Sequence, residues 1–293
     1  VSDMVAAKAA HKIIYNDVGE SLIESLGRHA GKPVILRARR GMGKSLVLDR
    51  IAQQQGRLTA KVNLFKSAKG RQFFGSYHPT SDGTLEWSDQ AWTELCRPNP
   101  DCSYPSQACV CAKSMLIIDE INRGNEDIQA RLLSMTEDAR PYIVLFEKGN
   151  DAFAIHPNVW ITGTMNPIGN GYSTNPLHSA LEDRFRFYNI DKPITDEAAV
   201  LDGILLSSKW GDTATRLMNM ASDLRVTEET YMSTRGLTKT AKSILYGEDI
   251  VDAIKLNFVN MLDSSNWGTV DAVIRSHFDK EWAKQGGITN LSF

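Results

Sequence analysis

The sequence lacks a long apolar segment and an excess of charge of either sign. Among its 293 residues, 33 lysines and arginines oppose 35 acidic residues, which leaves a net charge of −2. This balance gives no reason to expect a surface that binds polyanions in general, although a locally basic channel can lie inside a neutral protein. No apolar run approaches the ~20 residues of a membrane span. The first residues, VSDMVAAKAAHK, have neither the basic start nor the apolar core of a signal peptide, so we expect a cytoplasmic protein.

Cysteine is also scarce, and all four cysteines fall in one stretch, CRPNPDCSYPSQACVC. Its three prolines and its lack of apolar periodicity predict a loop with little packing of its own. One interpretation is a structural zinc ion held by the thiolates of Cys96, Cys102, Cys109 and Cys111, although the last two are closely spaced for one ion. The alternatives are free thiols in a reducing cytosol, or a disulfide in another compartment.

A phosphate-binding loop is predicted by ARRGMGKS, residues 38–45, which fits the pattern G-x-x-x-x-G-K-[ST] except that Ala38 replaces the first glycine. The apolar run at 33–37 predicts a strand before it, and the pattern of 44–53 predicts a helix after it. Such a loop turns its N–H groups around phosphates, with its lysine on the terminal phosphate oxygens. The alternative is a lysine on an ordinary glycine turn. We expect nucleotide contacts from Arg40, Gly41, Met42, Gly43, Lys44, Ser45 and Leu46.

A second signal is a pair of carboxylates after a buried strand, in SMLIIDEINRGN. The apolar run at 115–118 is typical of a strand covered on both faces of a parallel sheet, and ligands bind at the carboxyl ends of such strands. We expect Asp119 to bind Mg²⁺ together with the Ser45 hydroxyl, and Glu120 to polarise an attacking water. An acidic turn after a core strand is the alternative for either residue alone.

These segments resemble an ATPase family. LIIDEINRGN resembles the Walker B segment of AAA+ ATPases, and its tripeptide 121–123 resembles the MoxR branch, which is related to dynein-like, midasin and McrB-type modules. HPNVWITGTMNPIG resembles the sensor-1 strand, in which Asn166 would position the attacking water. LHSALEDRFRF resembles the segment that carries the arginine finger, here Arg184, and MSTRGLTKTAKSIL resembles the sensor-2 helix, here with Arg235. Five segments in the family's order make the resemblance specific.

The resemblance implies an α/β fold: a P-loop NTPase (AAA+) core with a parallel five-stranded sheet, followed by a small all-helical lid. We expect the core over residues 1–191, with a hairpin insert at 71–95 and a cysteine-rich loop at 96–111. The lid is expected over 192–293, where the pattern changes from strands to helices.

Local patterns give further expectations. If the insert at 71–95 projects from the core, Phe73, Phe74 and Tyr77 would be exposed; the alternative is a hairpin packed on its own core. A helix is expected over 18–30.

That helix would turn Val18, Leu22 and Leu26 toward the core. In the lid, Thr195 is expected to cap the first helix.

The leading functional hypothesis is an ATPase that uses ATP and Mg²⁺, assembles as a homo-oligomeric ring, expected to be a hexamer, and remodels or helps to mature a protein client. MoxR-like proteins often act with an adaptor that carries a von Willebrand A domain, which is a second expected partner. The alternative is a nucleic-acid-translocating motor of a restriction or viral system. A nucleotide-dependent switch without hydrolysis is a third reading, which the presence of Glu120 and Arg184 argues against.

Overall fold

We describe the protein from a computed structural model, which covers residues 14–98, 113–167, 176–205, 207–227 and 229–285. The chain forms two compact units. We call residues 21–39 and 44–191 the sheet unit, and residues 1–20, 40–43 and 192–293 the helical unit. None of the helices in the described ranges combines the length and the apolar character that a bilayer crossing requires.

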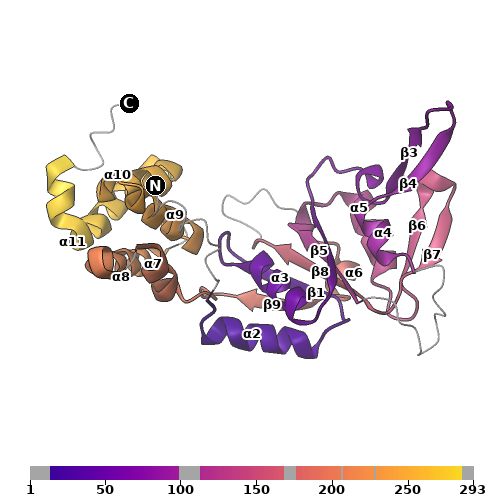
Figure 1. Ribbon diagram of the computed structural model, residues 1–293, viewed down its shortest axis with the longest axis horizontal. Helices are drawn as coiled ribbons and strands as arrows, with labels where there is room; N and C mark the ends of the chain where they lie inside the picture. The colour runs from indigo at the N-terminus through magenta and orange to yellow at the C-terminus, as the bar shows by residue number, and fades with distance from the viewer. Residues whose placement is uncertain (1–13, 99–112, 168–175, 206, 228, 286–293) are drawn as a thin grey trace. The chain divides into compact units, whose positions relative to one another are not determined.

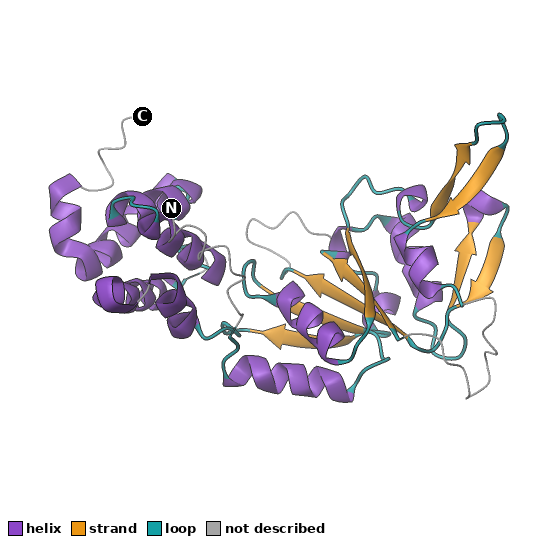
Figure 2. Ribbon diagram, in the orientation of Figure 1, coloured by secondary structure: helices purple, strands orange, loops and turns teal. Residues whose placement is uncertain are grey.

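The sheet unit is built on five parallel strands in the order β2-β5-β8-β1-β9 (Figures 1 and 2). Their bounds are β1 (Val34–Ala38), β2 (Leu58–Asn63), β5 (Ser114–Asp119), β8 (Val159–Met165) and β9 (Arg186–Ile190). Helices flank this sheet, and a helical region follows it in the chain. The expected α/β P-loop NTPase fold with a five-stranded parallel sheet is confirmed.

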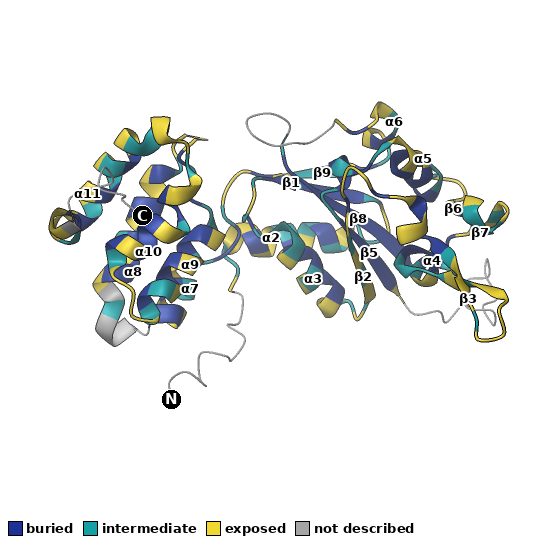
Figure 3. Ribbon diagram, turned by 90° about the horizontal axis from the view of Figure 1, so that it is seen from above, coloured by how far each residue is buried: buried dark blue, intermediate teal, exposed yellow. Residues whose placement is uncertain are grey.

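Burial agrees with the place of each strand in the sheet (Figure 3). Every residue of β8 is buried, and β5 is buried until its last residue, Asp119. A strand covered on both faces needs a continuous apolar or β-branched run, which β5 and β8 have. The edge strand β2 instead leaves most of its residues partly or fully exposed, as its sequence LTAKVN allows.

The helices of the sheet unit connect and cover the strands. They are α2 (Asp17–Arg28), whose first turn belongs to the helical unit, α3 (Lys44–Gln54), α4 (Ala91–Cys96), α5 (Glu126–Met135) and α6 (Ser179–Glu182), with short 3-10 turns at Gly70–Gln72, Ile121–Arg123 and Phe146–Lys148. Helix α5 starts where its sequence predicts, because the Asn125 side chain accepts a hydrogen bond from the Ile128 N–H at 3.1 Å. In α2, Val18 is exposed, contrary to expectation, and Ile23 is buried instead.

Two antiparallel hairpins extend the sheet unit beyond the central sheet. They are β3 (Gly75–Pro79) with β4 (Leu85–Asp89), and β6 (Tyr142–Leu145) with β7 (Asp151–Ala154). The second hairpin turns at Gly149 and Asn150, which both have positive φ values, 70° and 65°. Both hairpins lie at the same end of the sheet unit (Figure 1).

The exposure expected for the first insert is only partly correct. Phe73 and Phe74 are buried, with ring centroids 5.5 and 5.1 Å from that of Trp92. They precede β3 and anchor the base of the hairpin on α4, so they are not part of its projecting surface. Tyr77, inside β3, is exposed and packs its ring edge against Trp87 of β4.

A buried arginine joins the two hairpins to α5. Arg131, whose side chain is 8% exposed, pairs through both terminal nitrogens with Glu147 at 2.7 and 3.0 Å. Its guanidinium lies between the rings of Phe74 and Phe146, 4.8 and 4.9 Å from their centroids. A Cβ at Gly70 would lie 2.5 Å from the Arg131 and Glu147 side chains, so this position requires glycine. The arginine therefore fixes both inserts to one helix.

The helical unit has a core of its own, formed by residues such as Leu217, Ile244, Ile254 and Phe278. Its helices are α7 (Glu197–Leu205), α8 (Ser207–Leu224), α9 (Thr234–Leu245), α10 (Ile250–Asn257) and α11 (Trp267–Gln285), with 3-10 turns at Val259–Met261 and Ser264–Asn266. The cap expected of Thr195 is wrong by one residue. Asp196 accepts from the Ala199 N–H at 3.0 Å, because α7 begins at Glu197.

The expected zinc site finds no support. Cys96 ends α4 inside the apolar core of the sheet unit, and burial raises the pKa of its thiol to about 12. Such a thiol stays protonated, whereas zinc binds the thiolate. Cys102, Cys109 and Cys111 lie outside the described residues. Within the described ranges, no group of three or more His, Cys, Asp or Glu side chains could hold a metal ion.

We expect Cys96 to resist alkylation by iodoacetamide at pH 8 in the folded protein, because its thiol is buried and protonated. Mass spectrometry of the peptide that contains Cys96 measures the extent of labelling, and the same protein in guanidinium chloride gives the rate for an accessible thiol. Labelling of the folded protein at the unfolded rate would contradict the core position of Cys96.

Candidate functional site

Five of the predicted site residues, Lys44, Ser45, Asp119, Glu120 and Asn166, come together at one edge of the central sheet. Strands β5, β8 and β1 are direct neighbours and run parallel, so their carboxyl ends meet. Asp119 ends β5, Asn166 follows β8, and the segment after Ala38 leads from β1 to Lys44. Ligands of open parallel sheets bind outside this edge.

Lys44, the first residue of α3, is held by three oxygen atoms. Its Nζ donates to the backbone carbonyls of Ala38 and Arg39 at 2.7 and 3.1 Å, and to Asn166 Oδ1 at 2.9 Å. The ammonium therefore lies between the end of β1, at Ala38 and Arg39, and the residue that follows β8, Asn166. Phosphate oxygens carry more charge than these carbonyl and amide oxygens, and would be stronger acceptors for it.

Ser45 and Asp119 form the second contact of the site. The Ser45 hydroxyl donates to Asp119 Oδ1 at 2.7 Å, and the Thr164 hydroxyl donates to the same oxygen at 3.0 Å. A hydroxyl and a carboxylate oxygen side by side are the ligand types that Mg²⁺ prefers when it also binds phosphates. The donor set fits the expected ion, with Ser45 and Asp119 as the residues that would hold it.

Glu120 lies one residue further along and has an unusual backbone. Its φ and ψ of 56° and 47° are left-handed, which is rare for a residue other than glycine. The strand therefore ends here, and a 3-10 turn follows at once. Asn166 Nδ2 donates to Glu120 Oε1 at 3.4 Å, so the amide of Asn166 contacts both Lys44 and Glu120.

The glycine loop itself belongs to the helical unit, apart from its ends. Gly41 and Gly43 have positive φ values of 76° and 87°, which explains the need for glycine at both positions. A Cβ on Gly41 would lie 2.7 Å from Ser233, so close approach is a second reason. Ala38 needs no such freedom, because it is the last residue of β1 and pairs with Ile190. Ala38, the one residue that differs from the loop pattern, therefore has an extended backbone that does not require glycine.

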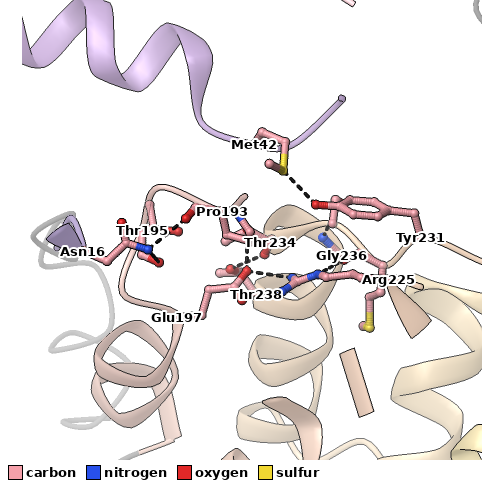
Figure 4. Close-up of polar contacts among 12 residues, drawn as sticks. Asn16, Met42, Pro193, Thr195, Glu197, Arg225, Tyr231, Thr234, Gly236 and Thr238 are labelled. Atoms are coloured by element: carbon pink, nitrogen blue, oxygen red, sulfur yellow. Dashed lines mark hydrogen bonds and ion pairs between the residues drawn. The ribbon is translucent and has the colours of Figure 1, made fainter. Parts of the chain in front are cut away.

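The remaining loop residues differ in exposure. Met42 is buried, and its sulfur accepts a hydrogen bond from the Tyr231 hydroxyl at 2.7 Å (Figure 4). The side chains of Arg40 and Leu46 are exposed. Leu46 therefore does not belong to the buried face of α3, which Val47, Leu48, Ile51 and Ala52 form.

Arg184 follows α6 and is held within its own chain. Its guanidinium donates to the Leu133 carbonyl and pairs with Glu137 Oε2 at 2.8 Å. Both partners lie at the end of α5, far along the sequence. The side chain is 28% exposed, so part of it remains accessible.

Arg235 is the second residue of α9 in the helical unit and is exposed. The start of this helix is fixed by an ion pair (Figure 4). Glu197 binds Arg225 through two bonds of 2.7 Å and also accepts from the Thr234 hydroxyl. Ser233 caps the helix by accepting from the Gly236 N–H at 3.1 Å.

Two residues of the site were not predicted from the sequence. Thr164 contacts Asp119 and also accepts from the Glu120 N–H at 3.3 Å. A signal was present, because Thr164 precedes Asn166 by two residues, so an extended chain turns both side chains to the same side. Arg123 pairs with Glu120 at 2.8 Å.

Comparison with known proteins agrees with this geometry. Residues 33–185 match the family model of the AAA domain, dynein-related subfamily, which is more than half of the chain. The chain belongs to this family. The matched range contains the glycine loop, the carboxylates of β5, Asn166 and Arg184. The expected relation to AAA+ ATPases of the dynein and midasin type is confirmed.

Two individual proteins are similar to this chain. The chain is 25% identical over 169 residues to Midasin of Dictyostelium discoideum, an alignment that covers 57% of this chain and 3% of that protein. It also resembles the crystal structure of a "putative ATPase" from Cytophaga hutchinsonii, with a TM-score of 0.46 and 14% identity, over 95% of this chain and 92% of that one.

We expect Lys44→Ala to weaken nucleotide binding at least about 100-fold, because each charge-assisted hydrogen bond to phosphate contributes about 1.5–3 kcal/mol. Titration of fluorescent ATP and GTP analogues in the presence of Mg²⁺ measures the affinity. Lys61→Ala is the matched control, since Lys61 forms an exposed ion pair with Asp49 on the surface. Unchanged affinity in folded Lys44→Ala protein would overturn the assignment of the loop.

Proposed function

We propose that the protein is an ATP hydrolase that works as a homo-oligomeric ring and remodels or helps to mature a protein partner. The observation that carries the proposal is the chain of contacts from Lys44 through Asn166 to Glu120, beside the pair of Ser45 and Asp119. These are a phosphate-binding cation, a polar positioning group, a candidate base and a set of Mg²⁺ ligands. Phosphoryl transfer to water needs these four elements.

In this proposal the chain binds ATP through the N–H groups of the loop 40–46 and the start of α3, whose dipole favours an anion. Lys44 exchanges its carbonyl partners for oxygens of the β and γ phosphates. Ser45 and Asp119 would hold a Mg²⁺ ion, which would supply positive charge that stabilises the phosphates. Glu120 accepts a hydrogen bond from the attacking water, and Asn166 keeps the water in line.

Two arginines complete the proposed machinery. Resemblance to AAA+ ATPases assigns Arg235 to the γ phosphate as the sensor-2 residue, and Arg184 to the phosphate bound by a neighbouring subunit. The partial exposure of Arg184 is compatible with such a contact. An arginine supplied by a neighbour makes hydrolysis depend on assembly, which is why we propose a closed ring, most simply a hexamer.

The proposed branch of the family and the proposed protein client are inferred from sequence resemblance. The segment DEINR resembles the MoxR branch, whose members act on protein partners, often with an adaptor that carries a von Willebrand A domain. The paired hairpins β3–β4 and β6–β7 support this proposal, because they offer exposed apolar side chains, among them Tyr77, Leu85 and Phe146, that could contact a polypeptide. The alignment covers only 3% of Midasin, so the activity of that whole protein does not support a proposal for this chain.

Hydrolysis is tested with Glu120→Gln. We expect this variant to bind ATP with an affinity within a few-fold of the wild type, and to lower kcat about 100-fold or more, because the amide cannot accept the proton of water. Phosphate release measures kcat, and titration of a nucleotide analogue measures the affinity. Glu94→Gln, at an exposed position of α4, is the control. Turnover of Glu120→Gln at the rate of the wild type would place the base elsewhere.

Assembly is tested with Arg184→Ala. We expect normal ATP binding and a fall in kcat of about 1,000-fold, because the arginine stabilises charge that develops only in the transition state. An equal mixture with Glu120→Gln should recover activity, since about a quarter of the shared sites would combine two intact halves. The rate of the mixture is compared with that of each variant alone.

Glu137→Gln is the matched control for Arg184→Ala, because it removes the same ion pair and leaves the arginine in place. If Arg184 only holds α5 and α6 together, the two variants should lose similar stability and similar activity. Equal losses, or a mixture no more active than its components, would count against a finger acting on a neighbour.

A further inference from the structure

The turn after β5 brings a cation to the proposed catalytic carboxylate. Arg123 ends the 3-10 turn Ile121–Arg123, and its N–H donates to the Glu120 carbonyl at 2.8 Å. The left-handed backbone of Glu120 starts this turn, so the two side chains, three residues apart, lie on the same side of it. The Arg123 Nη1 then reaches Glu120 Oε2 at 2.8 Å.

The two oxygens of Glu120 therefore have separate partners. Oε2 pairs with Arg123, and Oε1 accepts the weaker, 3.4 Å hydrogen bond from Asn166. Each carboxylate oxygen has two lone pairs, so Oε1 can accept from Asn166 and from a water at the same time. Asn166 also contacts Lys44, so Oε1 is the Glu120 oxygen linked through Asn166 to the proposed phosphate-binding lysine, and Oε2 is the oxygen paired with Arg123.

Arg123 forms few other polar contacts. Among the residues that the structure describes, Glu120 is its only ion-pair partner, and its Nε is buried without a hydrogen-bond partner. Because that nitrogen is shielded, the guanidinium cannot turn freely toward solvent. The side chains of the pair are 28% and 24% exposed, and pairs at such positions contribute little to stability. Stability alone therefore does not explain why the pair is there.

We infer that Arg123 is a positioning residue for hydrolysis: it fixes the Glu120 carboxylate through Oε2, so that Oε1 faces the attacking water. This inference rests on the proposed ATPase activity. A carboxylate on a flexible side chain would sample rotamers in which neither oxygen faces the water, and small misplacements of a reacting group cost much of the rate. Arg123 limits that sampling without touching the nucleotide.

The test is a double-mutant cycle with Arg123→Met and Glu120→Gln. In the wild-type background, Arg123→Met should leave ATP affinity within about three-fold and lower kcat about 10- to 100-fold. Arg123→Lys should regain part of the loss, since it restores the charge. In the Glu120→Gln background, Arg123→Met should cause no further loss, because the residue acts only through the carboxylate. Single-turnover measurements with excess enzyme reach the low rates of these variants.

Arg140→Met is the matched control, since Arg140 is exposed and lies outside the site. Equal losses in both backgrounds would show that Arg123 acts independently of Glu120, and an unchanged kcat or a change confined to ATP affinity would also overturn the inference. If Arg123→Met does not fold, Arg123→Gln, which keeps a polar side chain, decides the same comparison. These outcomes differ from failure of the proposed ATPase activity itself. In that case the wild type would release no phosphate, or Glu120→Gln alone would not lower its rate.

Discussion

The register between β8 and its two neighbours is the constraint on which the site depends. Gly163 lies opposite Ile118 of β5, one residue before β5 ends at Asp119, and opposite Ile35 of β1, which continues to Ala38. Thr164 thereby reaches Asp119, and Asn166 reaches Lys44 and Glu120. A slip of one residue in β8 would turn Thr164 and Asn166 to the other face of the sheet and separate them from Asp119, Lys44 and Glu120.

Helix α5 fixes the segments of the sheet unit that lie beyond the central sheet. It begins directly after the turn that carries Arg123, and polar residues along it bind different parts of the sheet unit. Gln129 accepts from the His178 N–H at the start of α6, and Arg131 binds both hairpins through Glu147 and two aromatic rings. Burying such groups is costly unless they are paired, and here they are. One short helix therefore sets the positions of the hairpins and of the segment that carries Arg184.

The sequence predicts the sheet and the principal site because both depend on local patterns. The buried run before Asp119 and the glycine spacing before Lys44 can be read without knowledge of distant residues. The sequence does not show contacts that distant residues decide. Phe73 and Phe74 are buried by Trp92 on a helix that the hairpin itself precedes, and the carboxylate that holds Arg184 lies 47 residues earlier, at Glu137. No period or motif in a single sequence shows such a pairing.

The oxygens of Ala38, Arg39 and Asn166 that accept hydrogen bonds from the Lys44 ammonium also affect which ligands the proposed site would favour. Because the lysine is solvated by the protein itself, binding is an exchange of acceptors, in which the ligand replaces partners that are already well placed. Only the difference between the two sets of acceptors contributes to affinity. Neutral or weakly charged oxygens, such as those of a sugar, gain almost nothing from this exchange. Densely charged phosphate oxygens would gain the most, so in the proposed site the resting contacts of Lys44 would favour phosphates over neutral polar ligands.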